Sequence, residues 1–231
     1  MEIPPEKVFL AQKMIITKCN LKGKPVVTAT QMLESMVKLP RPTRAEASDV
    51  ANSVLDGTDC VMLSGETAAG DFPVNAVTIM RRIVEEAESF IDYPSLFDAT
   101  CAGVASITRT LPATESVCCA CVKAAMDAKS PLILALTETG LTAKNIAKYR
   151  PQAPIMALSA SETTIRQLLI VRGVIPTPVA SMVGTDSVIQ KALAMAKEAG
   201  MVKAGDIVVA VHGTREELAG RAELLKIVTV S

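Results

Sequence analysis

Residues 131–158 read PLILALTETGLTAKNIAKYRPQAPIMAL, and this stretch decides the fold class. Two short apolar runs, at 131–136 and 154–158, flank a segment at 142–149 that is predicted to be helical. Short apolar runs without polar alternation are typical of strands buried in a parallel sheet, and parallel strands need a crossover connection such as a helix. The stretch therefore predicts a β-α-β unit.

The same alternation extends in both directions along the chain. On the amino-terminal side of residues 131–158, helices are predicted at 100–110 and 114–128. On the carboxy-terminal side, the predicted elements are helix 161–170, strand 174–179, helix 184–199, strand 206–211 and strand 225–230. Helix 184–199 carries Val188, Ala192, Met195 and Ala199 as one apolar stripe. Strands that alternate with helices predict the α/β class.

The first ninety or so residues continue this pattern, with helix 4–21, strand 25–29, helix 43–57, strand 59–63, a loop over 64–73 and helix 74–90. Thr43 and Glu46 have the spacing of a capping box. The segment DYPSLFD at 92–98 interrupts the pattern, so we expect a domain boundary there, with domains at 1–92 and 93–231. Two strands with three helices rarely close a core, so the first domain needs strands from other chains or from a larger domain.

Composition excludes several classes of protein. The chain has 231 residues, 49% of them hydrophobic, with 24 Lys and Arg against 24 Asp and Glu, so most of it is expected to be folded. No run reaches the roughly 18 apolar residues of a membrane span, and MEIPPEKVF lacks the features of a signal peptide. The balanced charge and few aromatic residues give no sign of nucleic-acid binding. A cytoplasmic protein without membrane or nucleic-acid partners is expected.

The six cysteines do not form a recognisable metal or redox motif. They are Cys19, Cys60, Cys101, Cys118, Cys119 and Cys121. The C-x-x-C spacing of Cys118 and Cys121 is compatible with redox or metal chemistry, but it lies in a helical stretch without a second Cys or His pair. We interpret these thiols as buried packing residues. His212 is too isolated to indicate a metal site.

Polar residues follow two predicted neighbouring strands at the point where each strand ends. Thr30 comes after strand 25–29, with Glu34 one helical turn later. Ser64, Gly65, Glu66 and Thr67 follow strand 59–63. Chemistry gathers at such strand ends in parallel α/β folds, although a Thr or Ser there is also a common helix cap.

A third polar stretch follows strand 131–136 and consists of Thr137, Thr139, Gly140 and Thr142. Hydroxyls and a glycine at a helix N-terminus form an anion cradle, because unpaired N–H groups and the helix dipole point at the ligand. Simple capping by Thr142 is the alternative. If the last two strands are neighbours, loop 213–220 lies across this site, and Arg215 or Arg221 adds charge.

Three long stretches resemble the pyruvate kinase family closely: EIPPEKVFLAQKMI at 2–15, KPVVTATQMLESM at 24–36 and RPTRAEASDVANSVLDGTDCVMLSGETAAGDFP at 41–73. LTETGLTAKNIAKYRP at 136–151 and GDIVVAVHG at 205–213 resemble the carboxy-terminal domain of that family. The resemblance implies that residues 1–92 are the last part of a (β/α)8 TIM barrel. Residues 93–231 would then form a complete three-layer α/β effector and assembly domain.

The resemblance also implies phosphoryl transfer from phosphoenolpyruvate to ADP, giving pyruvate and ATP, with Mg2+ and K+ as cofactors. In the family, the metal carboxylates, the K+ site and the catalytic lysine lie upstream of the position of Met1. We therefore expect this polypeptide alone to be inactive. The alternative is a non-catalytic fragment that binds a phosphosugar or serves in assembly.

Individual residues take expected roles from the resemblance. Thr30 is expected to contact the substrate and protonate the enolate, and Ser64 to belong to the proton relay. Glu34 and Glu66 are expected near the nucleotide and substrate. Arg41 and Arg44 match arginines at a subunit interface of the family's homotetramer, although a solvated helix start is the alternative.

The polar stretch of the second domain matches the family's effector loop for a sugar phosphate, through Thr137, Thr139, Gly140 and Thr142. Glu138 stands where members that respond to fructose bisphosphate often carry a lysine. A carboxylate there disfavours a second phosphate, so the expected ligand is a monophosphate.

Overall fold

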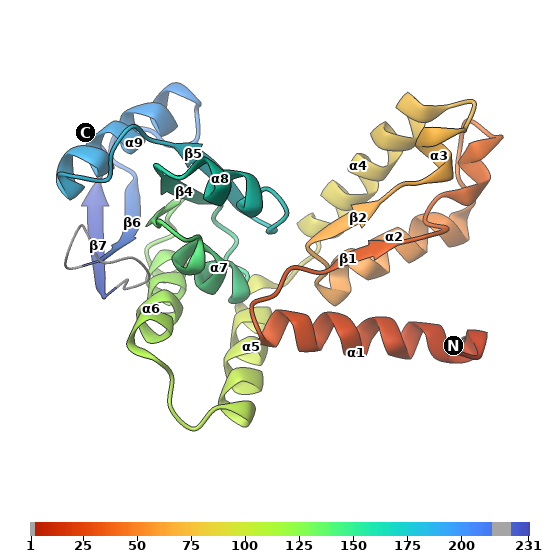
Figure 1. The fold of residues 1–231 in the computed structure, drawn as a ribbon, viewed down its shortest axis with the longest axis horizontal. Helices are drawn as coiled ribbons and strands as arrows, with labels where there is room; N and C mark the ends of the chain where they lie inside the picture. Colours follow the sequence, from red (N-terminus) through yellow and green to blue (C-terminus); the bar gives the residue numbers. More distant parts are fainter. Residues whose placement is uncertain (1–2, 214–222) are drawn as a thin grey trace. The chain divides into compact units, whose positions relative to one another are not determined.

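The computed structural model describes residues 3–213 and 223–231, and the chain divides into two compact units, Met1–Asp92 and Tyr93–Ser231 (Figure 1). Both units alternate helices with strands. In the described part of the chain, no helix combines the length and apolarity needed to cross a membrane.

The first unit is built around a small parallel sheet. β1 (Val27–Ala29) pairs with β2 (Cys60–Met62) in the register Val27↔Cys60, which confirms the prediction that the two strands lie side by side with their carboxyl ends at the same edge. The surrounding helical elements are η1 (Pro5–Lys7), α1 (Val8–Leu21), η2 (Glu34–Val37), α2 (Arg44–Asp56), α3 (Gly65–Ala68) and α4 (Pro73–Ser89).

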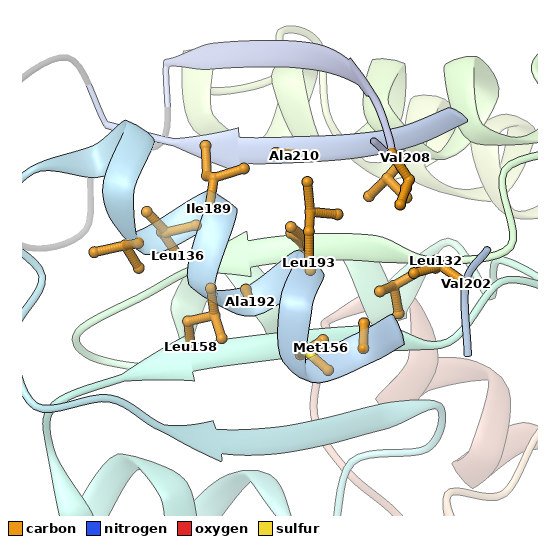
Figure 2. Packing of buried hydrophobic residues seen from close by; sticks show 14 residues of the cluster. Leu132, Leu136, Met156, Leu158, Ile189, Ala192, Leu193, Val202, Val208 and Ala210 are labelled. Carbon is orange, nitrogen blue, oxygen red and sulfur yellow. The ribbon is translucent and has the colours of Figure 1, made fainter. Parts of the chain in front are cut away.

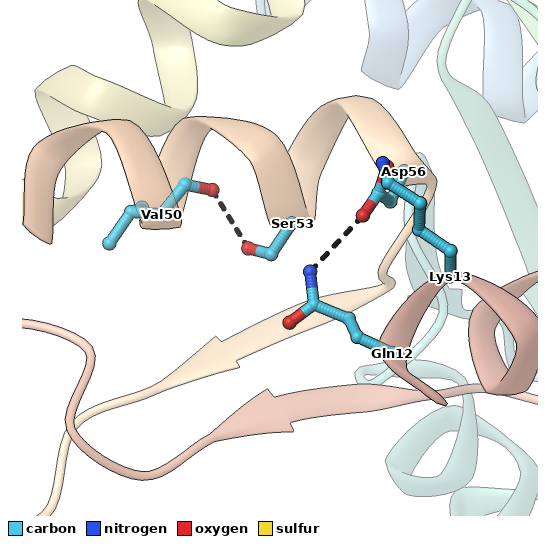
Figure 3. Close-up of polar contacts among 5 residues, drawn as sticks. All are labelled: Gln12, Lys13, Val50, Ser53 and Asp56. Atoms are coloured by element: carbon cyan, nitrogen blue, oxygen red, sulfur yellow. Dashed lines mark hydrogen bonds and ion pairs between the residues drawn. The ribbon is translucent and has the colours of Figure 1, made fainter. Parts of the chain in front are cut away.

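The ends of α2 are held by polar contacts that its sequence supplies. At its start, the Thr43 hydroxyl accepts from the Glu46 N–H at 3.3 Å, and the Glu46 carboxylate accepts from the Thr43 N–H at 2.7 Å, which confirms the capping box. At its end, Asp56 accepts from Gln12 Nε2 at 3.1 Å and pairs with Lys13 of α1 (Figure 3). Asp56 therefore ties α1 to α2.

Two predictions about the extent of elements are wrong. Residues 64–73 contain the helix α3, because the Ser64 carbonyl accepts from the N–H of Thr67 and Ala68 and so closes a single turn, which is too short to show helical periodicity. α5 (Tyr93–Ile107) begins at Tyr93, well before residue 100. Pro94 caused the error, since proline is tolerated in the first turn of a helix, where its missing N–H has no partner.

The second unit contains a five-stranded sheet in the order β5-β4-β3-β6-β7. β3 (Ile133–Leu136), β4 (Ile155–Ser159), β5 (Val174–Pro178) and β6 (Ile207–His212) are parallel, whereas β7 (Leu224–Thr229) pairs antiparallel with β6. The helices are α5, α6 (Ala113–Asp127), α7 (Leu141–Lys148), α8 (Glu162–Leu168) and α9 (Thr185–Glu198). The predicted β-α-β unit is β3-α7-β4.

Helices cover both faces of this sheet. Ile189, Ala192 and Leu193 of α9 pack on Leu134 and its neighbours on one face (Figure 2). The alternate strand residues, such as Ile133 and Val209, are equally buried, and α6 and α7 contact the strands. This is the three-layer α/β arrangement.

Candidate functional site

The backbone leaves β1 in an unusual conformation. Thr30 has φ +80° and Gln31 has φ +56°, and both side chains are exposed. A β-branched residue rarely adopts positive φ, and such strained residues cluster at functional sites. The strain turns the chain sharply, so that Met32 and Leu33 enter the core immediately afterwards. Sequence reasoning selected Thr30 but missed Gln31, which carries no recognisable signal.

Ser64 holds the corresponding position after β2. It is the N-cap residue of α3, but its hydroxyl makes no capping hydrogen bond. Its side chain is exposed, as is that of Thr30. Because β1 and β2 are adjacent and parallel, the two hydroxyls lie at one edge of the sheet. Capping therefore does not account for Ser64, and its hydroxyl is open to solvent or a ligand.

The Glu66 carboxylate links the segments that follow β1 and β2. Its side chain is 1% exposed, Oε1 accepts from the Leu33 N–H at 3.0 Å, and Oε2 accepts from the Ser64 N–H at 2.8 Å. Burial raises the pKa of Glu66, but the backbone N–H donors of Glu66, Ser64 and Leu33 outweigh burial, so the net pKa is lowered. Glu66 is thus an ionised support that fixes the spacing of the two loops.

A second carboxylate, Glu46, holds the segment that contains Glu34. The Ser35 N–H donates to Glu46 Oε1 at 2.7 Å, and the Ser35 hydroxyl donates to Oε2. Burial raises the pKa of Glu46, but the hydrogen bonds from Ser35 and Thr43 together lower it by more than burial raises it. The net pKa of Glu46 is therefore lowered. Glu34 itself begins η2 and is exposed. The sequence showed Glu46 only as a capping residue and missed its contact with Ser35.

Arg41 and Arg44 are exposed at the start of α2. Arg41 lines a cavity of about 270 Å³ together with Arg82, Asn75 and other residues of α4. Among the described residues, neither Arg41 nor Arg44 has an ion-pair partner. Both guanidinium groups are therefore available to an anion or an acidic partner.

The polar loop of the second unit follows β3. Thr137 is 4% exposed, and its N–H donates to the Leu158 carbonyl at 3.0 Å. The N-cap residue of α7 is Gly140 with φ +81°, so the alternative of capping by Thr142 is wrong. A Cβ at Gly140 would lie 3.2 Å from Leu168 Cδ2, and the positive φ also favours glycine. Glycine is needed here for both reasons.

The other members of the loop differ in exposure. Thr139 is exposed, Glu138 is half-buried, and Thr142 is 3% exposed in the first turn of α7. The Glu138 carbonyl accepts from the Thr164 hydroxyl at 2.5 Å, which anchors the loop to α8. Thr139 is therefore the loop threonine that is open to solvent, while Thr137 and Thr142 are buried.

The sheet order places this loop at a switch point. From β3 the chain passes through α7 to β4 on one side, and it later passes through α9 to β6 on the other side. Ligands of open α/β sheets bind outside the carboxyl ends of strands at such a point. β6 ends at His212, whose Nδ1 lies 2.9 Å from the Gly213 carbonyl oxygen. In the sequence, His212 is too isolated to indicate a site. The sheet order, which pairs β6 with β3, brings the end of β6 beside the end of β3.

Some predictions fall beyond this description. Arg215, Arg221 and residues 214–220 of the predicted covering loop lie outside the described residues, although β6 and β7 are neighbours as that prediction required. Residues 3–213 and 223–231 contain no group of three His, Cys, Asp or Glu side chains arranged to hold a metal ion. The described cysteines are free thiols. Cys118 and Cys121 are buried as predicted, whereas Cys19, Cys60, Cys101 and Cys119 are half-buried.

Comparison with known proteins gives matches along most of the chain. The family model of the pyruvate kinase barrel domain matches residues 1–77, and that of the pyruvate kinase alpha/beta domain matches residues 115–228. A pyruvate kinase of Eimeria tenella is 62% identical over the whole chain, and a cytosolic isozyme of Nicotiana tabacum is 49% identical. The chain spans 43% and 47% of those two relatives, or about half their length.

Solved structures give the same result. A crystal structure of a pyruvate kinase from Cryptosporidium parvum matches with a TM-score of 0.94 and 50% identity, covering 100% of this chain and 45% of that one. A structure of the Cryptosporidium parvum enzyme in complex with ADP matches with a TM-score of 0.90 and 51% identity, covering 100% of this chain and 46% of that one.

Proposed function

The chain belongs to the pyruvate kinase family, and we propose that it forms part of an enzyme that transfers a phosphoryl group from phosphoenolpyruvate to ADP. Its two units are the end of a barrel domain and the α/β domain of that family. The pair of exposed hydroxyls at the adjacent ends of β1 and β2 carries the proposal. We also propose that this enzyme is cytoplasmic and forms a homotetramer, with Arg41 and Arg44 at a subunit interface.

In this proposal Thr30 and Ser64 serve the second half of the reaction. Loss of the phosphoryl group leaves an enolate, which becomes pyruvate when its terminal carbon accepts a proton. The Thr30 hydroxyl delivers that proton, so its O–H bond breaks as the C–H bond forms, and the Ser64 hydroxyl belongs to the relay that restores it. Glu66 holds both loops in place through the Leu33 and Ser64 N–H groups.

The described residues do not fit a Mg2+ site by themselves. Mg2+ prefers carboxylate oxygens in octahedral geometry. Both oxygens of Glu66 accept backbone N–H groups, and only Glu34 offers an exposed carboxylate close in sequence to the strand ends. Phosphoryl transfer depends on cations around the moving group. We therefore propose that the Mg2+ and K+ ligands of the enzyme lie outside this chain, and that the chain alone is inactive.

A chimeric enzyme tests this proposal. We would join the preceding part of the Eimeria tenella relative to residues 1–231 and measure ATP formation from phosphoenolpyruvate and ADP with Mg2+ and K+. The chimera should be active and the chain alone inactive. Thr30→Ala should lower kcat of the chimera about 100-fold or more, since general acid catalysis contributes at least that much.

Thr163→Ala is the matched control, because Thr163 is an exposed threonine of α8 in the other unit. Its kcat should equal that of the parent chimera. A folded but inactive chimera, or Thr30→Ala with full activity, would contradict the proposal. Turnover by the chain alone that disappears in Thr30→Ala would overturn the prediction of inactivity.

For the second unit we propose a sugar-phosphate effector site at Thr137–Thr142. Support comes from the glycine-capped start of α7, the exposed Thr139 hydroxyl and the switch point between β3 and β6. The free N–H groups of α7 and its dipole favour a phosphate. Glu138 makes no ion pair among the described residues, so its charge repels a second phosphate nearby.

Calorimetry on the 231-residue chain tests this site with glucose 6-phosphate and fructose 1,6-bisphosphate. The monophosphate should bind more tightly, and Thr139→Ala should weaken it about tenfold through loss of a charged hydrogen bond. Glu138→Lys should reverse the preference, while Thr163→Ala leaves it unchanged. A folded chain that binds neither ligand would reduce this unit to an assembly module.

A further inference from the structure

α5 is attached to the second unit through one stripe of side chains. Phe97, Cys101 and Val104 recur at the i, i+4 and i+7 spacing of a single helix face, and Phe97 and Val104 are 6% and 2% exposed. The Phe97 ring centroid lies 6.0 Å from that of Tyr149, which is fully buried. Cys101 therefore occupies the middle of the contact that holds α5.

A second cysteine faces Cys101 across this contact. The Cys119 Sγ of α6 lies 3.7 Å from the Cys101 Sγ, and both side chains are half-buried. Cys118 and Cys121 are fully buried instead, and the Cys118 thiol points toward the Thr142 carbonyl. Of the three cysteines of α6, Cys119 is thus the one that combines partial exposure with a facing thiol.

We propose that Cys101 and Cys119 form an oxidative modification site, at which a hydroperoxide such as hydrogen peroxide converts the two thiols into a disulfide that links α5 to α6. In the first step the peroxide O–O bond breaks and one oxygen passes to a cysteine sulfur as sulfenic acid, while the other oxygen takes up the thiol proton and leaves as water, or as an alcohol where the oxidant is an alkyl hydroperoxide. In the second step the facing sulfur attacks, the S–S bond forms, the S–O bond breaks, and a second water leaves.

The surroundings determine how this site behaves. Burial raises the pKa of the Cys101 thiol to about 12, and the neighbouring Cys119 and Asp98 act in the same direction. Thiolate is therefore scarce at Cys101, so we expect oxidation of this pair to be slow. Ring closure is intramolecular, and the sulfurs need to approach by only about 1.7 Å to reach bonding distance, so closure outpaces further oxidation.

Mass spectrometry of the 231-residue chain tests the site. Treatment with hydrogen peroxide should remove about 2 Da, and a thiol reductant should restore the mass, as expected for one intramolecular disulfide. Arg109 lies between the two cysteines, so a non-reducing tryptic digest should join the peptide containing Cys101 to the one containing Cys119. The oxidised chain should also unfold at a higher temperature than the reduced chain.

Single variants decide which thiols react. Cys101→Ser and Cys119→Ser should each abolish the linked peptide and the rise in unfolding temperature, and Cys101→Ala repeats the test if a serine variant does not fold. Cys60→Ser, which changes a half-buried thiol of the other unit, should leave both readouts intact. A linked peptide that survives in Cys119→Ser, or sulfinic acid without any link, would overturn the proposal.

Discussion

The two units of this chain differ in how many apolar side chains they bury together. The buried cluster around α9 gathers 14 residues from helix and strands, whereas the corresponding cluster of the first unit has only Met32, Leu33, Met36, Val50, Ala76 and Met80. In α1, Val8, Phe9 and Leu10 are 51%, 56% and 55% exposed. The second unit covers both faces of its sheet with its own helices, while the first relies more on polar ties such as Glu66, Glu46 and Asp56.

The largest expected effect is in the core of the second unit. Leu134→Ala should lower the free energy of unfolding by about 3 kcal/mol, because Leu134 is fully buried and the change leaves a cavity. Urea unfolding followed by circular dichroism measures this difference. A loss below about 1 kcal/mol would mean that α9 closes over the space, and the contrast between the units would weaken.

The polar ties of the first unit come next. Glu66→Gln should cost about 2 kcal/mol at neutral pH, because an amide cannot accept from both the Leu33 and Ser64 N–H groups. Glu34→Gln is the matched control, since Glu34 is exposed, and its change should stay within about 0.5 kcal/mol. Equal stabilities of the two variants would show that Glu66 does not support the strand ends.

The same carboxylate predicts a dependence on pH. The folded pKa of Glu66 lies below its ordinary value of 4.5, so its contribution to stability is present above that value and is lost as the pH falls through the folded pKa. Between neutral pH and about pH 3, the free energy of unfolding should therefore depend less on pH in Glu66→Gln than in the parent chain. Identical pH profiles would contradict this assignment.

Helix caps allow a smaller but direct comparison between the units. The Thr43 hydroxyl caps α2 in the first unit, and the Ser161 hydroxyl accepts from the Thr164 N–H in the second. Thr43→Ala and Ser161→Ala should each cost about 1 kcal/mol in urea unfolding. A larger loss for Thr43→Ala would show that the Thr43 hydroxyl, which donates to Glu46 Oε2 at 2.8 Å, also supports the bond from Ser35 to Glu46.

The smallest effect on stability is expected on the exposed face of α1. Leu10→Gln should change the free energy of unfolding by less than about 0.5 kcal/mol, because Leu10 is already 55% exposed. Exposed apolar side chains favour association, so sedimentation should show less self-association in this variant than in the parent chain. A loss comparable to that of Leu134→Ala would mean that Leu10 is buried in solution.

Much of this architecture followed from local pattern. The apolar runs at 131–136 and 154–158 correctly predicted β3 and β4, because a strand buried on both faces has no polar alternation. Thr43 and Glu46 showed the start of α2, since a capping box is a contact between residues three positions apart. α3 and the early start of α5 escaped prediction, because a single turn has no period and Pro94 resembles a break.

The sequence alone determined the α/β class, the family resemblance and the choice of Thr30, Ser64 and the loop at Thr137–Thr142, because each rests on neighbouring residues. Only the tertiary structure decided what depends on contacts across the chain: the inward turn of Glu66, the positive φ of Thr30, Gly140 as the cap of α7, and the approach of Cys101 to Cys119. Cys101 and Cys119 are 18 positions apart in the chain, and Leu33 and Glu66 are 33 positions apart. No local sequence pattern records contacts over such separations.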